Sequence, residues 1–158
     1  MIVKQLIDED FVNYKKASML IGFPYCTMKC DKECGQPVCQ NSALAAAPEI
    51  RINSRDIVER YLDNPITSAI VYQGMEPMDS YTDLKTLTKT FRTYTDDDIV
   101  IYTGYNKDEI PDAINYLKDN FPNIIVKFGR YIPGQQPHYD SVLGVNLASD
   151  NQYAEVLS

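Results

Sequence analysis

Four cysteines lie within one short segment of the chain, and they have the clearest potential for chemistry. Cys26, Cys30, Cys34 and Cys39 are separated by three, three and four residues, and the only histidine, His138, is far away. Several thiolates at this spacing can turn around one centre, and thiolates suit both zinc and iron–sulfur clusters. The spacing alone does not decide between zinc and an iron–sulfur cluster. Inert or redox-active thiols are a third interpretation, which a cytosolic location disfavours.

The segments around the cysteines alternate between short apolar runs and amphipathic stretches. Apolar runs separated by helices are typical of a parallel sheet that is covered by helices and joined by right-handed crossovers. We therefore expect one α/β domain over residues 1–158, built on a small open parallel sheet with flanking helices. Strands are expected at 18–23, 50–52, 69–72, 99–102, 124–128 and 142–147, and helices at 55–62 with Ser54 as N-cap, at 82–94 and from Pro111 onward.

Three of the expected strands end at residues that could bind a ligand. The cysteines follow 18–23, Gly74-Met75-Glu76-Pro77 follows 69–72, and Thr103-Gly104-Tyr105 follows 99–102. Because ligands of such sheets bind beyond the carboxyl ends of the strands, we expect these segments to converge. Each segment taken alone could equally be a turn that ends a strand.

Composition excludes several classes of protein. The 158 residues carry a formal charge of −7, which disfavours binding to nucleic acid or to an anionic membrane surface. No apolar run approaches the roughly 20 residues of a membrane span. The N-terminal segment is acidic and lacks a small-residue cleavage site, so a signal peptide is not expected and the cytoplasm is the expected location. The chain is also too short for a closed eight-stranded barrel, which takes roughly 200 residues or more.

Taken together, these motifs resemble the radical S-adenosylmethionine (SAM) enzymes, and within them the activating proteins of anaerobic ribonucleotide reductases. That family has a Cys-x-x-x-Cys-x-x-Cys motif after its first strand and a Gly-Gly-Glu-Pro motif after its second. In this chain the cysteine loop is longer, and Met75 replaces the second glycine. The further matching segments are Asp10-Phe11-Val12-Asn13, Tyr102-Thr103-Gly104-Tyr105 and Ser149-Asp150-Asn151-Gln152.

The resemblance implies a partial (β/α) barrel of radical SAM type that holds a [4Fe–4S] cluster through three cysteines. Cys26 and Cys30 match the motif directly. Cys39 is the favoured third ligand, because an apolar residue precedes it and Asn41 follows two residues later, as in the family. Cys34 is the alternative third ligand, because it lies closer to the family spacing.

The resemblance also implies a SAM site and a reaction. Gly74, Met75 and Glu76 would bind SAM, with Glu76 on its ammonium group. Thr103 and Asn13 are further candidates that could instead be turn or cap residues. No catalytic residue is expected beyond the cluster ligands.

The implied activity is reductive cleavage of SAM to a 5′-deoxyadenosyl radical, which generates the glycyl radical of an anaerobic ribonucleotide reductase. The implied partners are the large catalytic subunit of that reductase and an electron donor such as a flavodoxin. A radical SAM enzyme that acts on another peptide or a small molecule is one alternative. A non-enzymatic iron–sulfur or zinc binding module is the other.

Overall fold

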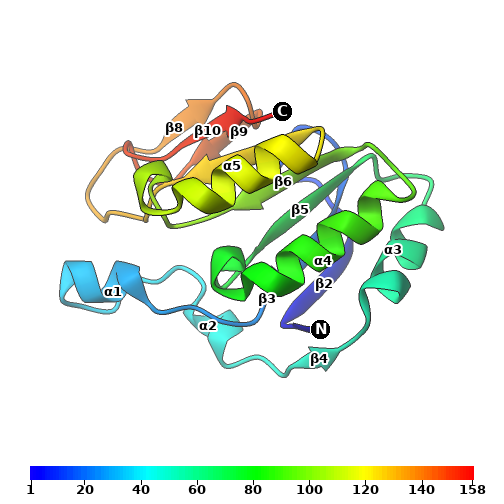
Figure 1. Cartoon of the computed structure of the whole chain (residues 1–158). Helices are drawn as coiled ribbons and strands as arrows, with labels where there is room; N and C mark the ends of the chain where they lie inside the picture. Colours follow the sequence, from blue (N-terminus) through cyan, green and yellow to red (C-terminus); the bar gives the residue numbers. More distant parts are fainter.

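The computed structural model describes all 158 residues and is built on a six-stranded sheet (Figure 1). Neighbouring strands follow the order β10-β7-β6-β5-β3-β2. This arrangement confirms the expected α/β class with a small sheet and flanking helices. The strands are β2 (Gln5–Asp10), β3 (Ser18–Phe23), β5 (Ala69–Gly74), β6 (Asp98–Tyr102), β7 (Ile124–Phe128) and β10 (Tyr153–Val156).

The sheet is mixed rather than wholly parallel, so the prediction of a parallel sheet is correct only for its centre. β3, β5, β6 and β7 are parallel neighbours, whereas β2 and β10 pair antiparallel at the two edges. The seven residues between β2 and β3 are too few for a crossover connection, so these two strands must run in opposite directions. β2 reads Gln-Leu-Ile-Asp-Glu-Asp and was missed, because its polar residues hide the apolar pattern of a strand.

Three helices cover one face of this sheet, as Figure 1 shows. They are α3 (Ser54–Leu62), α4 (Tyr81–Arg92) and α5 (Pro111–Asn120). β3, β5, β6 and β7 are adjacent in chain order, so every right-handed crossover moves the chain one strand in the same direction. All three crossover helices therefore lie on the same side.

Helix starts follow the sequence closely. Pro111 begins α5, as predicted. The predicted N-cap of α3 is wrong by one residue, because Asn53 and not Ser54 caps the helix. The Asn53 side-chain oxygen accepts a 2.8 Å hydrogen bond from the backbone N–H of Asp56.

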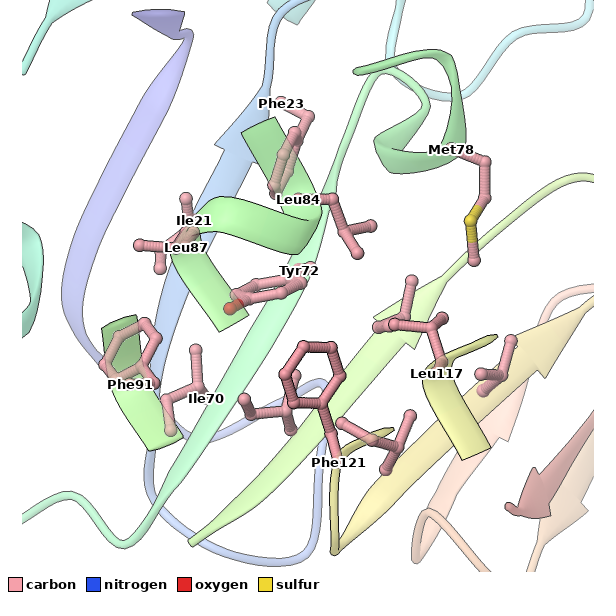
Figure 2. Close-up of a cluster of buried hydrophobic side chains, with 14 of the residues drawn as sticks. Ile21, Phe23, Ile70, Tyr72, Met78, Leu84, Leu87, Phe91, Leu117 and Phe121 are labelled. Carbon is pink, nitrogen blue, oxygen red and sulfur yellow. The ribbon is translucent and has the colours of Figure 1, made fainter. Parts of the chain in front are cut away.

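The main hydrophobic core lies between these helices and the sheet (Figure 2). Its 22 buried residues include Tyr72 on β5 and Leu87 and Phe91 on α4. Tyr72 packs edge-on against Phe23, with ring centroids 5.4 Å apart. Burial on this scale makes the helix face the main source of stability.

The opposite face of the sheet is covered by a hairpin and a loop instead of helices. The hairpin consists of β8 (His138–Asp140) and β9 (Val145–Leu147), which pair only with each other. The strand predicted at 142–147 is therefore shorter than expected and lies outside the main sheet. A second core of only seven buried residues joins this hairpin to the sheet: Tyr14, Ala69, Val71, Val100, Ile125, Leu143 and Leu147.

Smaller elements complete the chain. The predicted strand at 50–52 is the short strand β4 (Ile50–Arg51), which pairs with β1 (Ile2–Val3) outside the main sheet. The segment between β3 and β4 holds two short helices, α1 (Lys29–Cys34) and α2 (Ser42–Ala45). The 3-10 turns η1 (Pro77–Ser80) and η2 (Lys107–Glu109) precede α4 and α5. None of the helices has the length and apolarity needed to cross a membrane.

Candidate functional site

A cavity of about 310 Å³ lies at the carboxyl ends of the parallel strands. Its lining comes from the segments that follow β3, β5, β6 and β7, and from the β9 hairpin. The structure therefore brings together all three strand-end segments that the sequence singled out. The predicted site residues that line the cavity are Asn13, Cys26, Cys30, Cys39, Gly74, Met75, Glu76 and Thr103.

The cysteines differ in where they lie. Cys26, Cys30 and Cys39 line the cavity, whereas Cys34 is the last residue of α1 and does not. One carboxylate oxygen of Asp31 accepts hydrogen bonds from the backbone N–H groups of Val38 and Cys39, both at 2.8 Å. These bonds fold the chain after α1 back on itself, which returns Cys39 to the cavity. The segment that carries Cys34 is therefore an excursion between Cys30 and Cys39.

The thiols are not arranged as a metal site. No three of the His, Cys, Asp and Glu side chains come close enough to hold a metal ion together. All four cysteines are free and partly buried, and burial raises the pKa of the Cys26 and Cys30 thiols above its usual value. The cavity thus brings three cysteines to its lining without grouping their thiols as a metal site.

Charged side chains tie α1 to the end of β7. Arg130 is 6% exposed, and its guanidinium contacts Glu109 on one side and Glu33 of α1 on the other, with Nε and Oε1 of Glu33 3.2 Å apart. The Arg130 contact holds the pKa of Glu109 at about 2. The Lys29 ammonium lies 4.1 Å from the centre of the Tyr105 ring. Two of the six residues of α1 thus bind to the rest of the domain through charge.

Glu76 is a buried carboxylate at the floor of the cavity. One of its oxygens accepts hydrogen bonds from Thr103 Oγ1 (2.8 Å) and Met78 N (3.0 Å), and the other accepts one from Gly104 N (2.8 Å). None of its partners is a cation, and burial raises the pKa of Glu76 to about 7. Three fixed donors around a carboxylate without a counter-ion form a site that suits a positively charged ligand.

The neighbours of Glu76 explain how the strand end is shaped. Gly74 has φ of +102°, and a Cβ there would lie 2.7 Å from the backbone of Gly22, so only glycine fits. Met75 has no positive φ, and its N–H donates to the carbonyl of Phe23 at 3.1 Å. A methionine is therefore accommodated at position 75 without backbone strain.

Asn13 and Thr103, two of the predicted site residues, form hydrogen bonds to neighbouring carboxylates. The Asn13 side chain and backbone N–H both donate to the carboxylate of Asp10, which makes Asn13 part of a turn at the rim of the cavity. Thr103 donates its hydroxyl proton to Glu76, so its role is to orient that carboxylate. Gln152 of the C-terminal motif lines the cavity as well, and its amide donates to the carbonyl of Gly129 at 3.2 Å.

Among the lining residues that sequence reasoning did not predict, Lys127 is the one with a basic side chain. This lysine lines the cavity from β7, is 7% exposed, and donates from Nζ to the carbonyl of Gly129 at 2.9 Å. Burial lowers the pKa of Lys127 to about 8. The signal was present, because Lys127 is the only charged residue in an otherwise apolar buried strand.

Comparison with known proteins adds no relative. No family model, no curated protein and no solved structure matches this chain. The function must therefore be argued from the cavity itself, which combines three thiols, a buried carboxylate and a buried lysine at the carboxyl edge of a sheet.

Proposed function

We propose that this protein is a radical SAM enzyme whose cluster is held by Cys26, Cys30 and Cys39. The observation that carries the proposal is that these three thiols line the same cavity as Glu76, while the fourth cysteine lies outside it. A site with three thiolates leaves one iron of a [4Fe–4S] cluster without a protein ligand, which is what SAM chemistry needs.

The donor set fits such a cluster by its chemistry, because thiolates are the usual ligands of iron–sulfur groups. The three thiols have to draw closer than they are in this chain. Metal sites are rarely preformed without the metal, and neither α1 nor α2 contains a buried residue that would resist this rearrangement. The chemistry that the cluster supplies is one-electron reduction of SAM, which yields methionine and the 5′-deoxyadenosyl radical.

The chain's own residues bind and orient the ligand. The Glu76 carboxylate, fixed by Thr103, Met78 and Gly104, pairs with the ammonium of SAM. Pairing with an ammonium keeps Glu76 ionised, which overcomes the raised pKa that burial imposes. Gly74 and Met75 bring the backbone of the strand end to the cavity wall.

The finer assignments follow from the resemblance together with the architecture. Four parallel strands in chain order with all three crossover helices on one face support a partial (β/α) barrel of radical SAM type. The proposed substrate is a glycine of the large catalytic subunit of an anaerobic ribonucleotide reductase, with an electron donor such as a flavodoxin, in the cytoplasm. Val12, which lines the cavity and is 73% exposed, and its chain neighbour Phe11, which is 64% exposed, support contact with a macromolecule.

The test is anaerobic reconstitution followed by reduction in the presence of SAM. We expect about four irons and four sulfides per chain, and release of 5′-deoxyadenosine. Glu76→Ala should weaken SAM binding about 10- to 100-fold, whereas Glu49→Ala, at an exposed position, should not change it. Zinc in place of iron after reconstitution, or unchanged SAM affinity in Glu76→Ala, would contradict the proposal.

A further inference from the structure

Only two of the side chains that line the cavity belong to acidic or basic residues, and they have opposite charges: Glu76 and Lys127. We propose that this pair recognises both ends of an α-amino acid group, with Glu76 on the ammonium and Lys127 on the carboxylate. The inference rests on the proposed function for the Glu76 contact. It adds Lys127 as the residue that binds the carboxylate of the ligand.

Lys127 reaches the cavity because of its position on β7. Alternate residues of that strand face opposite sides of the sheet, so Val126 and Phe128 join the helix-side core while Ile125 packs on the hairpin side. Lys127 shares the side of Ile125. Its side chain therefore lies on the hairpin side of the sheet, where it lines the cavity.

The Lys127 ammonium has unused binding capacity. It can donate three hydrogen bonds, and the structure gives it one acceptor, the carbonyl of Gly129. The Tyr102 ring centre lies 5.9 Å from Nζ, which adds only a weak attraction for the cation. A buried ammonium with one neutral partner lowers the stability of the fold. Packing alone therefore does not explain why a lysine occupies this position.

Lys127 and Glu76 form no ion pair, although the charge of Glu76 offsets part of the lowering that burial imposes on the pKa of Lys127. The ion pairs of the protein join other residues, and the carboxylate of Glu76 is occupied by three neutral donors. Two opposite charges buried in one cavity would be stabilised most simply by direct contact. Their separation leaves both free to bind a molecule that carries both charges, and the amino-acid end of SAM is such a group.

A two-by-two binding experiment tests the pairing of Lys127 with the carboxylate. Reconstituted wild-type protein and Lys127→Met are titrated anaerobically with SAM and with decarboxylated SAM, which keeps the amine and lacks the carboxylate. We expect wild type to prefer SAM by about 10- to 100-fold, as for a charge-assisted contact, and Lys127→Met to lose most of that preference. Lys118→Met, an exposed lysine on α5, should keep the full preference.

The outcomes separate the two proposals. If wild type binds SAM and Lys127→Met keeps the full preference for it, the assignment of Lys127 is wrong while the proposed function stands. If wild type binds neither ligand, both proposals fail. Lys127→Gln repeats the comparison with a neutral side chain that keeps hydrogen-bond donors, so a folding defect of the methionine variant cannot decide the result.

Discussion

The two faces of the central sheet are built from the same strands but differ in how they are filled. The helix face buries 22 apolar residues under α3, α4 and α5. The hairpin face buries seven, and at its carboxyl end apolar packing gives way to the cavity with Glu76 and Lys127. One face therefore supplies stability, while the other accepts buried charges that reduce it.

This division shows how a sheet of this kind can carry buried polar residues at one edge and still fold. Strand residues alternate between the faces, so a polar residue such as Lys127 can enter the cavity while its neighbours Val126 and Phe128 remain in the main core. Substitutions on either face of the sheet test this division.

The largest effect is expected for the cysteines, because the cavity contains three of them and excludes the fourth. Cys39→Ser should lose the cluster and SAM cleavage, since serine is a poor ligand for soft metals, whereas Cys34→Ser should keep both. Iron content and visible absorbance after anaerobic reconstitution measure this. Loss of the cluster only in Cys34→Ser would reverse the assignment, and loss in both variants would indicate four thiolate ligands and no open iron for SAM.

A substitution on the helix face should reduce stability without affecting the site. Leu87 on α4 is fully buried in the main core, so Leu87→Ala should lower the free energy of unfolding by about 2–5 kcal/mol. Leu62→Ala, at 45% exposure on α3, is the matched control and should have little effect. Urea unfolding measures both variants. A Leu87→Ala protein with full stability would show that the helix face is not the main source of stability.

The buried carboxylate on the cavity face should make stability depend on pH. Native Glu76 has a pKa of about 7 against 4.5 when exposed, so the native state binds this proton more tightly. The free energy of unfolding should therefore fall as the pH rises from about 4.5 to 7, by up to about 3 kcal/mol from this group. In Glu76→Gln this part of the slope should disappear, while Glu49→Gln should keep it; identical slopes in all three proteins would be the contrary result.

The smallest effect concerns the charges that hold α1 beside the cavity. The Glu33 side chain is 60% exposed, so its ion pair with Arg130 should contribute less than about 1 kcal/mol. Glu33→Gln should raise the rate at which iodoacetamide alkylates Cys30 by about two- to five-fold at low salt, and less at high salt. Glu155→Gln breaks an exposed ion pair elsewhere and should leave the rate unchanged. Equal rates in all three proteins would remove Glu33 from the positioning of α1.

Local sequence patterns were enough to predict the central strands and most helices of this protein. The central strands appear within a residue or two of their predicted bounds, because apolar runs flanked by turn residues are visible in any short window. The same holds for the helices that begin at Ser54 and Pro111. The strand-end motifs could be found for the same reason, and the rule that ligands bind at that edge of a sheet was enough to predict that they meet.

The remaining features of the fold and the site depend on contacts between segments that are distant in the sequence. The antiparallel edge strands β2 and β10 and the separate β8–β9 hairpin depend on pairing partners that no local pattern reveals. Spacing could not choose between Cys34 and Cys39 as a neighbour of the cavity, because the hydrogen bonds from Val38 and Cys39 to Asp31 set the path of the loop. The place of Lys127 in the site also depends on distant segments. A strand pattern shows that Lys127 and Val126 face opposite sides of the sheet, but only the packing of the helices decides which side is the core and which side has the cavity.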